Sequence, residues 1–352
     1  MKTRPLLFFT VMAALAGSYF IGRQRPAAPA LALAAVVPAA PSLRSVLDLS
    51  DPLESNLHFS DYLRSLTAAQ AAQDAALLWS AQGDERELNE RKRLFFLAWG
   101  RVDGPGAVAF VQTNHGPGKV ACLGAALAGW AGKNPADTKA WIEGHLKPHE
   151  RTMYNWALVD GWARSDRQGA TDYVLSLETL PGSERFMRTV AGEQVRQGAA
   201  QAATWAEALP PGTMRQTAVQ EVAARWSRES PADTMKWAAS LTDSSLLKNA
   251  VAATVREWSQ RDRIAATGYL NTMPDGLARN HAVETLVGSL AAEDPRSVAT
   301  WAATITEPML KQQALVTLGK TWLATDRPAA LAWLPNSGLT AAAQHAVSQS
   351  RP

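Results

Sequence analysis

The sequence predicts an all-α protein, an α-solenoid of about eight to nine stacked antiparallel helix pairs that follow one another with a 32-residue period. Three columns of residues predict this fold when the chain is written in rows of 32. Two columns hold aromatic residues, and the third holds residues that begin helices. The composition, with 47% hydrophobic and 19% charged residues, is typical of a folded chain.

The first aromatic column consists mainly of tryptophan. Its members are Trp99, which stands one residue early, and Trp130, Trp162, Trp226, Trp258 and Trp322, while Gln194 and Leu290 fill the two other rows. The second column lies eleven residues further along and is formed by Phe110, Trp141, Tyr173, Trp205, Trp237, Tyr269, Trp301 and Trp333. Burying one tryptophan removes ~150–250 Å² of its surface from water. We therefore expect both columns to form a structural core between helices, the alternative being an exposed aromatic track for sugars or extended peptides.

The third column lies four residues after the first and predicts helix starts. It is formed by Asp103, Asn134, Asp166, Gly198, Ser230, Asp262, Asp294 and Asp326. Seven of these are favoured helix N-caps, and glycine is tolerated there. Loops rich in proline and glycine, such as 209–212, then predict where the first helix of each pair ends. The second helix runs to the next tryptophan, and in 213–226 its apolar residues recur four or five positions apart on one face.

The chain outside the repeat predicts a leader, a linker and two caps. Lys2 and Arg4 precede an apolar run from Leu6 to Ile21, which has the outline of an export signal. Both a cleaved signal and a retained membrane anchor stay open, because 16 residues are slightly fewer than the ~17–25 of a spanning helix. Ser60 is the expected N-cap of the first capping helix, since an acid follows it. The predicted division is 1–22 signal peptide or N-terminal membrane anchor, 23–43 linker rich in proline and alanine, 44–66 N-terminal capping helix, 67–335 helical repeat array, and 336–352 C-terminal capping helix and tail.

The basic pI of about 9.0 belongs to the leader. Residues 1–25 hold four basic residues and no acid, and the rest of the chain has 31 basic and 32 acidic residues. A nucleic-acid partner is therefore not expected. The leader predicts an exported protein that is periplasmic, or anchored in the inner membrane and facing the periplasm if the leader is uncleaved. The single cysteine, Cys122, rules out an internal disulfide and is expected to be inert core.

No motif in the sequence predicts catalysis. His145 and His149 have the spacing of metal ligands on a helix, but Pro148 lies between them and no second ligand pair accompanies them. The glycine-containing segment 114–119 lacks the spacing of a phosphate-binding loop. We therefore expect no catalytic residue, no cofactor and no metal.

A row of basic residues is the candidate partner-binding site. It is formed by Arg151, Arg215, Lys248, Arg279 and Lys311. All five are expected in the first turn of a second helix, where the helix dipole disfavours a cation. Stacked units would bring them to one edge that could bind an acidic peptide or another anionic polymer. The alternative is that each cation pairs with the capping aspartate of a neighbouring unit.

Over about 67–335, the chain resembles the α-solenoid superfamily that includes tetratricopeptide and HEAT-like repeats. It is most similar to exported bacterial proteins with a repeat of the type W-x3-[DN]-P-x2-A-x2-W. The period of 32 differs from the 34 of tetratricopeptide repeats, so the peptide-groove residues of that family cannot be carried over. The resemblance implies a non-catalytic protein-interaction scaffold in the cell envelope that binds a protein or peptide partner. The alternative is a polysaccharide-binding or polysaccharide-degrading protein of the α/α type.

Overall fold

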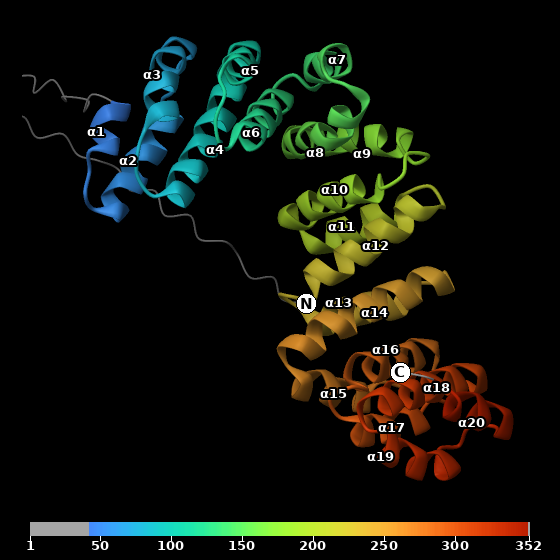
Figure 1. Cartoon of the computed structure of the whole chain (residues 1–352). Coiled ribbons are helices and arrows are strands. Elements are labelled where there is room, and N and C mark those ends of the chain that lie inside the picture. The colour runs from blue at the N-terminus through green and yellow to red at the C-terminus, as the bar shows by residue number, and fades with distance from the viewer. Residues whose placement is uncertain (1–41, 351–352) are drawn as a thin grey trace, which may run out of the picture. The chain divides into compact units, whose positions relative to one another are not determined.

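The computed structural model describes residues 42–350. This part of the chain is all-helical, with twenty α-helices, one short 3-10 turn and no β-strand (Figure 1). The predicted leader, nearly all of the linker and the last two residues of the tail lie outside the described residues.

Each predicted capping residue begins a helix. In all eight rows the first helix of the pair, here called the A helix, starts at the next residue, and in six rows the cap side chain accepts a backbone hydrogen bond. Asp262, for example, accepts from the Ala265 N–H at 2.9 Å. The A helices are α5 (Gly104–Thr113), α7 (Pro135–His145), α9 (Arg167–Ser176), α11 (Ala199–Ala208), α13 (Pro231–Ser240), α15 (Arg263–Thr272), α17 (Pro295–Ala303) and α19 (Arg327–Trp333).

The second helix of each pair, here called the B helix, is longer than the A helix before it in the first seven rows. Helix α4 holds the same place in the unit ahead of the first row. The B helices are α4 (Glu85–Val102), α6 (Lys119–Ala131), α8 (Pro148–Ser165), α10 (Glu184–Gln197), α12 (Thr213–Trp226), α14 (Ser244–Arg261), α16 (Leu277–Leu290) and α18 (Pro308–Thr325). Successive B helices contact one another, from α4 through α18. An A helix such as α13 packs against the two B helices on either side of it in the sequence, here α12 and α14.

The two aromatic columns meet inside each row. The tryptophan near the end of a B helix lies against the aromatic residue in the middle of the A helix that follows, as in Trp226–Trp237, whose ring centroids are 5.8 Å apart. Six of the eight rows have such a pair. Burial is uneven: Trp99, Trp130, Trp258 and Trp322 are buried, whereas Trp162, Trp226 and the whole second column, with Trp141, Trp205, Trp237, Trp301 and Trp333, are half-buried.

The ends of the array differ from the prediction at one point. Residues 44–66 hold most of α1 (Leu43–Leu47) and all of α2 (Pro52–Arg64), rather than one helix. Ser60 lies inside α2, and the N-cap is Asp51, whose carboxylate accepts from two backbone N–H groups while proline takes the next position. Helix α2 packs against α4 and is followed by α3 (Ala68–Ser80). At the other end, α20 (Ala341–Ser348) follows the 3-10 turn Leu334–Asn336 and packs against α18.

Among the described residues, none of the helices combines the length and the apolar character that crossing a membrane requires.

Candidate interaction surface

The structure does not bring the predicted basic row together as one exposed edge. Lys248 is exposed, and Arg151, Arg215, Arg279 and Lys311 are half-buried. Two of the arginines bind the carbonyl groups at which A helices end. Arg151 Nε donates to the Leu146 carbonyl at 2.8 Å, and Arg279 Nη1 donates to the Thr304 carbonyl of the next row at 3.2 Å.

These contacts explain why a cation stands in the first turn of a B helix. Leu146 and Thr304 are the C-caps of α7 and α17, and carbonyl groups at a helix C-terminus lack partners within their own helix. A guanidinium that binds these carbonyl groups lies at the negative end of the A-helix dipole. This favourable position offsets its unfavourable position at the positive end of the B-helix dipole. In residues 42–350 the salt bridges of the row are Lys248–Glu284 and Arg279–Asp275, and none joins a cation of the row to a capping aspartate, so the alternative of such pairing is wrong.

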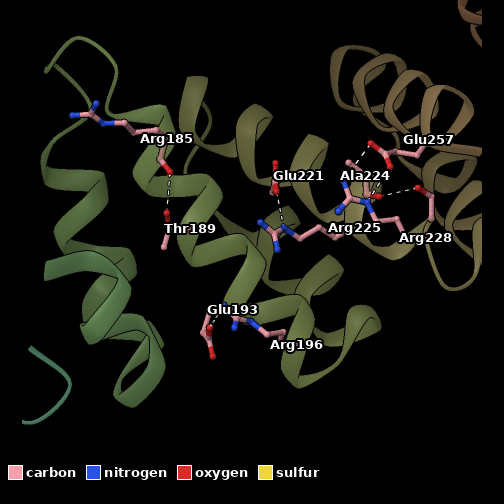
Figure 2. Close-up of polar contacts among 10 residues, drawn as sticks. Arg185, Thr189, Glu193, Arg196, Glu221, Ala224, Arg225, Arg228 and Glu257 are labelled. Carbon is pink, nitrogen blue, oxygen red and sulfur yellow. Dashed lines mark hydrogen bonds and ion pairs between the residues drawn. The ribbon is translucent and has the colours of Figure 1, made fainter. Parts of the chain in front are cut away.

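The exposed side of the B helices carries a series of ion pairs (Figure 2). Glu193 pairs with Arg196 on α10 at 2.6 Å, and Glu221 pairs with Arg225 on α12 at 2.6 Å. Arg228, just after α12, reaches Glu257 on α14 at 2.9 Å and so connects two successive layers. Glu193 is buried, Glu221 and Glu257 are half-buried, and the exposed members are the cations Arg196 and Arg228. The main effect of these pairs is to cover the B-helix side with fixed, mutually neutralised charge.

An open cavity of about 780 Å³ interrupts this surface between α14, α16 and α18. We call it the α16 groove. Its floor is α16, where Thr285, Gly288 and Ser289 line it, and its walls include Arg256 and Gln260 from α14 and Thr317 from α18. Gly288 and Thr317 are exposed. The lining is polar and largely uncharged at its floor, so a main chain or a polar side chain could enter it without losing hydrogen bonds.

The charged groups around the α16 groove are mostly paired. Glu284 lies 3.6 Å from Lys248 Nζ and 2.8 Å from His281 Nδ1. Arg263 pairs with Glu293. Arg256 is exposed and takes part in no salt bridge within the described part of the chain. The groove therefore presents one guanidinium that is free to bind an anion.

The same side of the array is closed at α4, α6 and α8. Glycines stand where these helices cross: an added Cβ at Gly129 would overlap the Leu97 carbonyl oxygen, and one at Gly161 would overlap the Ala128 carbonyl oxygen. The backbones are therefore in contact, and the cavity beside them measures only about 260 Å³.

The other candidate residues have structural surroundings. The His145 ring stacks on Trp141 with centroids 5.1 Å apart, and His149 lies in the first turn of α8. Residues 42–350 contain no group of three or more His, Cys, Asp or Glu residues that could hold a metal ion. Cys122 is buried in α6, and burial raises the pKa of its thiol to about 11. Residues 114–118 form the turn from α5 to α6, and Lys119 begins α6.

Sequence reasoning missed the α16 groove. Two features of the sequence indicate it. A small residue, Gly288, stands two positions before the first-column residue Leu290, and the residues that face it from the next row, Thr317 and Thr321, are short. That combination can be recognised only when the register of neighbouring B helices is known.

A scan against protein-family models gives no match, and searches of curated proteins and of solved structures give none either. The resemblance to exported helical-repeat proteins therefore depends on the repeat pattern alone.

Proposed function

We propose that the chain is an α-solenoid of about eight to nine helix pairs that acts as a non-catalytic interaction scaffold outside the cytoplasm. The 32-residue frame and the consecutive contacts of the B helices support this arrangement. Residues 1–43 would tether it to the inner membrane, or direct its export to the periplasm if they are cleaved. Its partner would be a segment of another protein bound along the exposed side of the B helices.

The α16 groove is the observation that carries this proposal. Its volume of about 780 Å³ lies within the ~300–1,000 Å³ of ligand sites, but it is open along one side and polar. Hydroxyl groups and an unpaired guanidinium suit an extended peptide, whose main chain needs donors and acceptors along its length. Helical-repeat proteins in general present extended surfaces to their partners.

Carbohydrate binding is a second candidate, supported by Trp156. This residue of α8 lies outside both aromatic columns and is 45% exposed, the largest exposure of any described tryptophan. Its ring lies against Gly124 on the B-helix side. A single exposed indole can stack on one sugar, but the half-buried second column offers no continuous track.

Site-specific photo-crosslinking in cells tests the scaffold proposal. A photoreactive phenylalanine analogue replaces Gln260 at the α16 groove in one full-length variant and Lys236 on α13 in the control. Both positions are exposed, but only the first belongs to the B-helix side. We expect a discrete protein adduct from position 260 and none from position 236. Equal adducts from both positions, or none from position 260, would contradict the proposal.

A further inference from the structure

Two notches on the B-helix side stand in the same register of the repeat. One lies over Gly192 on α10 and the other over Gly288 on α16, three periods of 32 residues later. In the next layer, Glu221 and Arg225 of α12 correspond to Thr317 and Thr321 of α18 at the same spacing. Gly192 and Gly288 therefore occupy equivalent positions of the repeat, but different side chains of the next layer lie beside them.

The first notch is filled by the protein itself. The guanidinium of Arg225 lies over Gly192, so closely that a Cβ at this glycine would be 2.6 Å from Arg225 Cζ. Glu221 holds that guanidinium through its Nε at 2.6 Å, as Figure 2 shows. Gly192 is buried as a result.

The second notch is empty. No atom would lie within 4 Å of a Cβ at Gly288, and the residue is exposed. Threonine side chains at 317 and 321 are too short to cross to α16 as Arg225 crosses to α10. The α16 groove is thus the cavity that remains because Thr317 and Thr321 stand where the other notch has the Glu221–Arg225 ion pair.

Charge indicates what would occupy the groove. Three cations, Lys248, Arg256 and Arg263, line it together with two carboxylates, Glu284 and Glu293. Since each carboxylate has a cation within salt-bridge distance, Arg256 leaves one positive charge uncompensated. Ser289 and Thr317 add hydroxyl groups that form no hydrogen bond within residues 42–350. A carboxylate on an extended polypeptide matches this arrangement.

We propose that the α16 groove is the docking site for an extended, acidic segment of a partner protein. A carboxylate of the segment pairs with Arg256, and its main chain lies over Gly288 within reach of the Ser289 and Thr317 hydroxyls. This assignment rests on the proposed scaffold function and names the site and the chemistry of the partner. A nucleic acid is disfavoured because the chain after residue 25 has 31 basic and 32 acidic residues.

The test uses the full-length chain and fluorescein-labelled hexaglutamate, with hexalysine and an oligothymidylate as alternative probes, measured by fluorescence anisotropy. We expect saturable binding of hexaglutamate and a loss of at least about tenfold in R256Q, the factor for one charged hydrogen bond. The matched control R228Q removes the same charge from a guanidinium that already pairs with Glu257, and should change binding less than about twofold.

The double variant T317E/T321R copies the Glu221–Arg225 pair into the groove without changing the net charge. We expect it to abolish hexaglutamate binding while circular dichroism shows an intact helical fold. Absence of hexaglutamate binding, equal losses in R256Q and R228Q, or unchanged binding by T317E/T321R would overturn the assignment. Equally tight oligothymidylate binding with the same dependence on these variants would overturn it in favour of a nucleic acid.

The photo-crosslinking experiment separates failure of this assignment from failure of the scaffold function. If T317E/T321R keeps the adduct at position 260, the scaffold function stands and the groove assignment fails. If the parent chain gives no adduct at position 260, the scaffold function itself fails.

Discussion

The layers α4–α6–α8 and the layers α14–α16–α18 use the same repeat but close their exposed side differently. In the first region, Gly129 and Gly161 let backbones touch, and the neighbouring cavity is about 260 Å³. In the second region, polar and charged side chains stand on the corresponding surface and leave about 780 Å³ open. The aromatic pairs between the B helices and the A helices that follow them are present in both.

This difference indicates that the side of a B helix that faces the A helices and its exposed side are subject to different structural constraints. The side toward the A helices sets the repeat, and its residues recur with the 32-residue period. The exposed side is free of that constraint, so small residues can close it in one region and a polar groove can open in another. A variable surface on a constant core is compatible with the scaffold function that we propose.

The largest expected effect tests whether the core is equal in both regions. Trp130 and Trp258 are 9% and 8% exposed and each packs against an aromatic residue of the next A helix. We expect Trp130→Ala and Trp258→Ala to lower the free energy of unfolding by similar amounts, ~3–5 kcal/mol each, in urea denaturation. The exposed Trp156 is the control and should cost under ~1 kcal/mol. A large loss in only one region would show that the core is not repeated.

The second prediction tests the closed and open surfaces against each other. Gly161→Ala should destabilise the protein by ~1–3 kcal/mol, because its methyl group would overlap the Ala128 carbonyl oxygen. Gly288→Ala meets no atom within 4 Å and should raise stability by ~0.5–1 kcal/mol through helix propensity. Urea denaturation of both variants measures the contrast, and changes of the same sign would remove it.

The third prediction concerns the caps, which should behave alike in both regions. Asp262→Ala should cost ~0.5–2 kcal/mol, because the Ala265 N–H loses its acceptor. The same measurement on Asp103→Ala should give a similar loss, since this carboxylate accepts from the Gly106 N–H at 3.0 Å. No loss at either position would mean that the caps do not set the helix starts.

The fourth prediction concerns how the stabilisation by the capping residue Asp166 depends on pH. The Gly169 N–H and then the Trp162 indole hold the pKa of the Asp166 carboxyl below its usual value. A lowered folded-state pKa means that the stabilisation is present above the unfolded value of ~3.9 and is lost as pH falls through the folded value. Asp166→Asn can still cap the helix, so we expect little change at pH 7 and a smaller loss of stability between pH 5 and pH 2 than in the parent chain. An unchanged acid dependence would contradict this.

Much of the fold could be predicted from the sequence because its determinants are local and repeated. The capping column predicted the start of every A helix, and in six of the eight rows the cap side chain accepts a hydrogen bond from a backbone N–H within three residues. The prediction failed at Ser60, where Asp51 with a following proline provides an earlier and better start. The pairing of the two aromatic columns within a row was missed, because periodicity alone does not tell which residues of neighbouring helices touch.

The site was less predictable than the fold. The basic row was found as a pattern, but two of its arginines, Arg151 and Arg279, bind carbonyl groups at helix ends, which no sequence column displays. The α16 groove depends on Gly288 in one layer and on Thr317 and Thr321 in the next. The matched pair Gly192 and Arg225 differs from it by side-chain reach, a property that appears only once the helices are placed.

The most direct measurement of the central claim compares two engineered cysteines at the same position of the repeat. Ala128 and Gly288 both stand two residues before the first column, the former buried and the latter exposed. Native Cys122 is buried, with a pKa of about 11, and provides the unreactive background. We expect a maleimide to label Gly288→Cys at least about tenfold faster than Ala128→Cys, because labelling the buried position requires local opening that costs more than ~1.4 kcal/mol. Equal labelling rates would contradict the claim that the exposed side of the B helices is closed at α4–α6–α8 and open at α14–α16–α18.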